Sequence, residues 1–143
     1  MYISDLEKMK VSFSTLWNGD IGEDSYHFEF TRHSDTMTVM VKAKYFNDSS
    51  PKEPKGYLMG LWEYEVAEVF FLNHATKEYL ELEFGPHGHY LALKFQGSRN
   101  QIDKDTVMNF EYKASIKDGH WTGLAEIPLS YFPEDFDKFN CYG

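Results

Sequence analysis

Apolar and polar residues alternate along much of this chain, and the alternation predicts β-strands. In residues 36–45, TMTVMVKAKY, every second residue from Met37 to Tyr45 is apolar. A period of two places these residues on one face of a strand. Residues 26–32, YHFEFTR, repeat the pattern, and the polar HSD between the two segments predicts a hairpin. We therefore expect half-buried antiparallel strands.

Further strands are predicted at residues 11–17, within 66–88, and at 89–95, 108–116 and 120–127. Polar turns separate them, and Pro128 begins one expected helical turn. Residues 46–60 form the longest loop, where two prolines and two glycines disfavour regular structure. Seven or eight short strands joined by short turns predict an all-β fold, an antiparallel β-sandwich that occupies residues 1–143 as one domain.

The segment 66–88 holds acids inside two predicted strands, and its pairing register decides which way they face. One register sets Glu68 opposite Phe84 and collects the aliphatic residues on one face. A one-residue slip sets Glu68 opposite Glu83, and like charges opposite each other are destabilising. We expect the first register. It puts Glu68 on the core face, with Glu81 and Glu83 beside Tyr79 on the other face.

These three glutamates are candidate site residues. A carboxylate among core residues must be paired, hydrogen-bonded or neutralised, so Glu68 is either a structural partner or a functional group. Glu81 and Glu83 are either an ordinary solvated sheet face or a hydrogen-bonding rim for a polyol or a metal. Tyr79 shares their face, which therefore mixes aromatic and acidic side chains.

Composition limits the function classes. The chain has 143 residues, of which 42% are hydrophobic and 17% aromatic, and its net charge is −9. That charge repels phosphates and anionic lipid, so neither nucleic acid nor a membrane is an expected partner. The single cysteine, Cys141, allows no intrachain disulfide. Since residues 1–13 contain no apolar signal run, we expect a reduced, cytoplasmic protein.

Histidines supply the metal candidates. His87 and His89 flank Gly88, His74 lies in the preceding loop, and zinc accepts histidine nitrogen together with carboxylate oxygen. The alternative interpretation is a polar turn, since no recognised ligand spacing is complete. Calcium is a second possible cation, although the alternating acids of an EF-hand loop are absent. Without a nucleophile elbow or a phosphate loop, the default interpretation is non-enzymatic.

Tryptophans bear on ligand binding. An indole offers a flat apolar surface with one donor, which suits stacking on a sugar ring. Trp62 follows the long loop and is expected to be exposed, whereas Trp17 and Trp121 are expected to pack in or at the rim of the core. Arg99, in the GSRN connection, could add a bidentate clamp.

Four segments carry a family resemblance: LWEYEVAEVFFLN, YLELEFGPHGHYLAL, WTGLAEIPLSYFP and KFN. Together they resemble uncharacterised protein family 0462, a group of small cytosolic chains. More distantly the chain is similar to family-9 carbohydrate-binding modules. That likeness implies a β-sandwich in which aromatic side chains hold a sugar ring. The related chains continue past KFN, so it also implies a final strand that is missing here or only begun at residues 139–142, leaving an open edge.

The leading hypothesis is a non-catalytic binding module for a glycan or another polar small molecule. Trp62 would stack on the ligand, the glutamates and Arg99 would hydrogen-bond it, and loop 46–60 would form one wall. The second hypothesis is a metal-dependent hydrolase or lyase built on His87, His89 and the sheet glutamates. The third is a protein-interaction domain that uses the aromatic-acidic face or an open edge.

Overall fold

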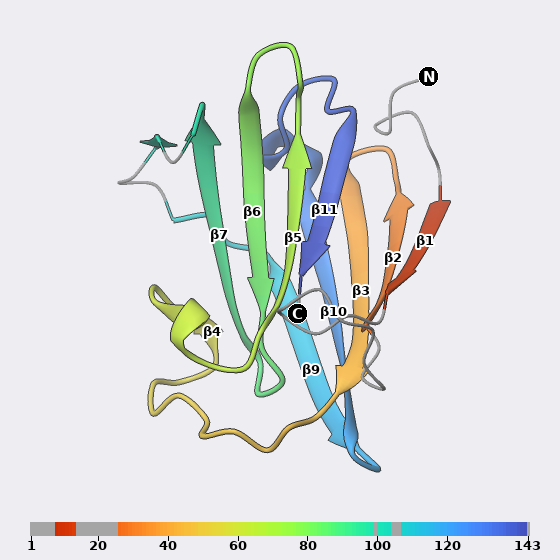
Figure 1. Ribbon diagram of the computed structural model, residues 1–143, viewed down its shortest axis with the longest axis vertical. Coiled ribbons are helices and arrows are strands. Elements are labelled where there is room, and N and C mark those ends of the chain that lie inside the picture. The colour runs from red at the N-terminus through yellow and green to blue at the C-terminus, as the bar shows by residue number, and fades with distance from the viewer. Residues whose placement is uncertain (1–7, 14–25, 99, 104–106, 143) are drawn as a thin grey trace.

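Two β-sheets packed face to face form the fold (Figure 1). The computed structural model describes residues 8–13, 26–98, 100–103 and 107–142. The first sheet has the order β1 (Lys8–Phe13), β2 (Tyr26–Arg32), β3 (Thr36–Lys44), β10 (His120–Pro128) and β9 (Glu111–Lys117). The second has the order β11 (Lys138–Tyr142), β5 (Ala67–Leu72), β6 (Glu78–Phe84), β7 (His89–Gln96) and β4 (Gly56–Tyr57), with β8 (Gln101–Ile102) also paired to β7.

The core lies between the sheets and is built from the alternating residues. The inward set of β2 and β3 is buried as predicted: Tyr26, Phe28, Phe30, Met37, Val39, Val41 and Ala43. Phe30 meets the second sheet edge to face, with its ring centroid 5.2 Å from that of Phe71 and 5.5 Å from that of Phe139. Trp121 is buried in this core, as the sequence predicted. The all-β, antiparallel prediction is therefore confirmed.

Several local predictions need correction. The first strand ends at Phe13, so the rest of the predicted strand, with Trp17 and the turn after it, lies outside the described residues. Loop 46–60 was predicted to be irregular, but Gly56–Tyr57 forms β4 and pairs in parallel with β7. The polar connection after β7 likewise contains β8. The expected turn after Pro128 is the 3-10 helix η3 (Leu129–Tyr131).

The predicted register of β5 and β6 is wrong. Glu68 lies opposite Glu83, Val69 opposite Leu82, and Phe71 opposite Leu80. The turn decides this, because the Asn73 amide donates to the Glu78 carbonyl and so sets residue 73 opposite 78. The inward residues of β5 are consequently Ala67, Val69 and Phe71, and Glu68 lies on the outer face with Glu81 and Glu83.

The segment at residues 138–142 is a paired strand. β11 runs antiparallel to β5, with Lys138 opposite Leu72 and Tyr142 opposite Glu68. The edge of β5 is therefore covered, and in the described part of the chain β11 is the last strand of its sheet. Its inward side chains, Phe139 and Cys141, pack against the core.

A tyrosine ties the two sheets together. Tyr112 of β9 donates its hydroxyl proton to the carbonyl oxygen of buried Gly85, at 2.7 Å. Burial raises the pKa of Tyr112 far above its ordinary value, which keeps the phenol a donor. Gly123 of β10 leaves room for this side chain, since a Cβ there would lie 2.8 Å from the Tyr112 ring carbon Cε1.

We expect Tyr112→Phe to lower the free energy of unfolding by about 1–2 kcal/mol, because it leaves a buried carbonyl without its donor. Urea unfolding followed by circular dichroism measures the change. Tyr131→Phe is the control, since the Tyr131 hydroxyl bonds an exposed carbonyl, that of Asn109. Equal effects of the two substitutions would contradict the proposed tie.

Candidate ligand groove on the outer sheet face

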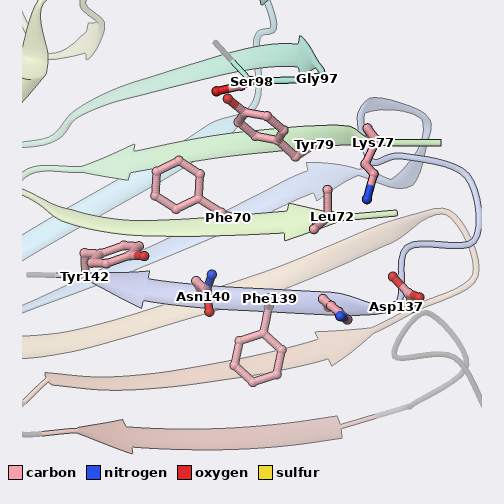
Figure 2. Close-up of a pocket in the computed structure, with 11 residues that line it drawn as sticks. Phe70, Leu72, Lys77, Tyr79, Gly97, Ser98, Asp137, Phe139, Asn140 and Tyr142 are labelled. Carbon is pink, nitrogen blue, oxygen red and sulfur yellow. The ribbon is translucent and has the colours of Figure 1, made fainter. Parts of the chain in front are cut away.

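Three aromatic rings from three adjacent strands gather on the outer face of the second sheet (Figure 2). Phe70 of β5 lies between Tyr79 of β6, at 6.2 Å between ring centroids, and Tyr142 of β11, at 5.5 Å. Tyr79 also stacks on Phe95 of β7, at 4.7 Å and 10° between planes. Cross-strand pairing explains the arrangement, because residues on one face of neighbouring strands lie side by side.

These rings line a groove of about 610 Å³, which we call the aromatic groove. Such a volume is within the usual range of small-molecule sites. The remaining lining residues come from β5, the turn after it, the connection after β7, and β11 with the residue before it: Leu72, Lys77, Gly97, Ser98, Asp137, Lys138, Phe139 and Asn140. The groove therefore combines an apolar aromatic surface with hydroxyl, amide and charged groups.

Buried Asn73 builds the end of the groove that lies near Leu72. Its Oδ1 accepts the backbone amides of Ala75 and Thr76, at 2.8 and 3.1 Å, which forms an Asx turn. Its Nδ2 donates to the Glu134 carbonyl, which joins this turn to the segment before β11. Asp137 adds a second connection between this turn and the segment before β11, because its Oδ1 accepts the His74 amide at 2.9 Å. These bonds hold the turn and β11 in one position.

The three candidate glutamates form an acidic cluster next to the aromatic rings. Glu68 is opposite Glu83, and Glu81 is opposite Phe70. Glu83 is only 1% exposed, and its Oε1 has no hydrogen-bond partner among the described residues. Burial, followed by its hydrogen bond to Glu81 and the charges of Glu68 and Glu81, raises the Glu83 pKa to about 9. Glu83 is thus a neutral acid that donates to Glu81.

Burial also raises the pKa of both other glutamates. For Glu68 the neighbouring charge of Glu81 adds to this effect, whereas the hydrogen bond from Glu83 partly offsets it for Glu81. Glu68 itself lines a second hollow of about 350 Å³. Tyr142 lines both hollows, so its ring separates the aromatic groove from the Glu68 side.

The structure brings together only part of the predicted site. Tyr79 lines the aromatic groove, and Glu81 and Glu83 lie beside the rings. Trp62, in the 3-10 helix η2 (Leu61–Glu63), is 51% exposed as expected, but it lines neither the groove nor the second hollow. Arg99 lies outside the described residues. Loop 46–60 contributes Phe46 and Asp48 to the second hollow and no residue to the groove.

The histidines do not gather as the metal hypothesis requires. His74 is in the turn between β5 and β6, whereas His87 and His89 are at the other end of β6 (Figure 1). His89 is buried and its Nε2 lies 2.8 Å from the Glu53 carbonyl oxygen, while His87 lies edge to face with Tyr45. Within the described ranges, no three His, Cys, Asp or Glu side chains are arranged to hold a metal ion.

Sequence reasoning missed Phe70, Tyr142 and the two groove lysines. The misassigned register put Phe70 in the core, and Tyr142 lies in the strand that was expected to be missing or only begun. An available signal was the alternation in residues 138–142, KFNCY, which puts Lys138, Asn140 and Tyr142 on one face. Cys141 faces the core, where burial raises its thiol pKa to about 12.

The fold and the groove define an all-β chain in which a groove on the outer face of the second sheet carries aromatic, hydroxyl, amide and charged groups. The described residues include no helix long and apolar enough to cross a membrane. No protein-family model matches the chain, and no solved structure does. The likeness to family-9 carbohydrate-binding modules therefore has no support from known structures.

The chain is similar to proteins named UPF0462 protein C4orf33 homolog. The Mus musculus protein is 47% identical over 108 residues, which cover 74% of this chain and 55% of the relative. The Rattus norvegicus protein is 43% identical over 108 residues, 74% of this chain and 53% of the relative. The Danio rerio protein is 40% identical over 115 residues, 79% of this chain and 57% of the relative.

The chain thus matches little more than half the length of these relatives. They support the resemblance to uncharacterised protein family 0462 that the sequence motifs indicated.

Proposed function

We propose that this chain is a non-catalytic binding module for a polar small molecule or a glycan, and that the aromatic groove is its binding site. The observation that carries the proposal is the groove of about 610 Å³ with Phe70, Tyr79 and Tyr142 on its wall. Aromatic faces stack on the C–H faces of sugar rings and on other flat ligands. Ser98 and Asn140 add hydrogen-bonding groups that could orient hydroxyls.

In this proposal Tyr142 stacks on the ligand, in place of Trp62, which the sequence suggested for that role. Tyr142 is 53% exposed, so its ring can contact a ligand without any rearrangement of the buried core. Phe70 and Tyr79 are half-buried, and their ring contacts with each other and with Phe95 fix the aromatic surface of the groove. Side chains that are already held by packing lose little conformational entropy when a ligand binds, which favours binding.

Titration with mono- and oligosaccharides, followed by amide chemical shifts in two-dimensional NMR, tests the proposal. We expect at least one sugar to shift the amides of Ser98 and Asn140. Tyr142→Ala should weaken its binding about fivefold to tenfold, since one stacking contact is lost.

Trp62→Ala is the matched control, because Trp62 is equally exposed but lies outside the groove. It should leave the affinity unchanged. Binding that depends on Trp62 and not on Tyr142 would overturn the assignment of the site. No shift at the groove amides with any member of the panel would overturn the binding function for this class of ligand.

A further inference from the structure

The charged lining of the aromatic groove is basic in an otherwise acidic protein. It consists of Lys77, Lys138 and Asp137, while the chain as a whole has a net charge of −9. The Asp137 carboxylate already accepts the His74 amide. The lining therefore carries a net positive charge, and neither ammonium is held in an ion pair within the described residues.

The backbone holds both lysines at one end of the groove. Lys77 has a left-handed φ of 65°, its amide donates to the Asn73 carbonyl, and its own carbonyl accepts the Gly97 amide, both at 2.9 Å. Lys138 lies opposite Leu72 on β11. Leu72 directly precedes the turn that carries Lys77, so both lysines flank the Leu72 end (Figure 2 shows Lys77 beside Leu72).

The acidic cluster lies toward the opposite end of the rings. Tyr142 is paired with Glu68, and Phe70 is paired with Glu81. Moving along β5 from Leu72 through Phe70 to Glu68, the charges beside the groove thus change from positive to negative. An anion is attracted to the lysine end and repelled from the glutamate end, which fixes its orientation.

We propose that the groove binds a small organic anion with one flat apolar face. The flat face lies on the rings of Phe70, Tyr79 and Tyr142, and the carboxylate or phosphate group lies at the Leu72 end, within reach of Lys77 and Lys138. This inference rests on the proposed binding function and adds the charge and the orientation of the ligand. Charge-assisted hydrogen bonds from lysine are the strongest contacts that this lining can make.

Matched aryl ligands test the charge preference. Nitrophenyl glucuronide and nitrophenyl glucoside share an aryl group and a sugar ring, and the glucuronide has a carboxylate where the glucoside has a hydroxymethyl group. Nitrophenyl phosphate keeps the aryl group and supplies a phosphate as the anion. Each is titrated into the intact chain while the Gly97, Ser98 and Asn140 amides are followed by NMR. We expect the preferred anion to bind about tenfold more tightly than the glucoside, with the difference shrinking at high salt.

Substitutions locate the anionic group. Lys77→Gln and Lys138→Gln should each reduce the preference for the anion, and the double variant should abolish it. Lys113→Gln is the control, because it removes an equal charge from β9 of the other sheet. Circular dichroism confirms that each variant is folded. The two anions distinguish a carboxylate ligand from a phosphate ligand.

The outcomes separate this inference from the function on which it rests. Equal affinities for the glucuronide, the phosphate and the glucoside, with groove amides shifted by all three, would overturn the anion preference and keep the binding site. An anion preference that survives in the Lys77→Gln, Lys138→Gln double variant would also overturn it. No shift of the groove amides by any ligand would overturn both proposals.

Discussion

Glu83→Gln is expected to stabilise the protein by several kcal/mol at pH 8, about 1.4 kcal/mol for each pH unit above 4.5, an unusual result for a buried substitution. Glu83 is 1% exposed, and burial raises its pKa to about 9 from an ordinary value of 4.5. The unfolded chain releases this proton near pH 4.5, whereas the folded chain keeps it until about pH 9. The folded state therefore binds the extra proton between these values, and stability falls as pH rises.

Glutamine removes this fall in stability with rising pH, because its amide stays neutral at every pH. It also keeps the contact with Glu81, since the amide N–H can donate where the Glu83 acid donates. We therefore expect the variant and the parent to have similar stability near pH 4 and to diverge as pH rises toward 9. Urea unfolding at pH 4, 6 and 8 measures the divergence.

Glu63→Gln is the control for the loss of one carboxylate. Glu63 is exposed on η2, away from the acidic cluster, so its effect should stay within about 0.5 kcal/mol. A Glu83→Gln variant that is less stable than the parent at pH 8, or whose stability changes with pH as the parent's does, would show that Glu83 is ionised in the folded protein.

Gly123→Ala is expected to lower the free energy of unfolding by about 3 kcal/mol, because it overpacks the core. A Cβ at residue 123 would lie against the Tyr112 hydroxyl oxygen and 2.8 Å from its ring carbon Cε1. The ring cannot stay in place, so the hydrogen bond to the Gly85 carbonyl breaks as well. In most strand positions alanine is preferred to glycine. A destabilising effect here would therefore show that the Tyr112 side chain lies too close to residue 123 to leave room for a Cβ.

A double-mutant cycle tests this explanation. In the Gly123→Ala background the Tyr112 hydrogen bond is already lost, so Tyr112→Phe should cost less than it does in the parent. Leu124→Ala is the control on the same strand, since Leu124 is 50% exposed and should have a small effect. Additive effects of Gly123→Ala and Tyr112→Phe would mean that the two residues act independently.

Alternation predicted the first sheet well because only one of its faces packs against the core. In β2 and β3 the apolar residues from Tyr26 to Ala43 fall on the inward face, and polar residues dominate the outward one. With one apolar face, a period of two leaves a single consistent orientation. Trp62 was expected in solvent on different grounds, because it follows the long loop, and it is 51% exposed.

Alternation failed in the second sheet because both of its faces carry apolar side chains. Val69 and Phe71 point inward, yet Phe70 and Leu72 point outward to the aromatic groove. Leu91 and Leu93 of β7 form a second buried cluster with Leu61. When either face can be buried, hydrophobicity no longer selects the register, and the turn geometry does so instead.

The amino-acid pattern alone established that this chain is made of antiparallel strands, which side chains of the first sheet are buried, and that the chain is acidic, since each of these follows from local sequence. Three features required the three-dimensional arrangement: the Glu68–Glu83 pairing, the neutral buried Glu83, and the groove with its two lysines. The first two depend on the β5–β6 register, which the Asn73 turn sets and hydrophobicity does not. The groove depends in addition on β11, which is far from β5 in sequence and becomes its neighbour only in the folded chain.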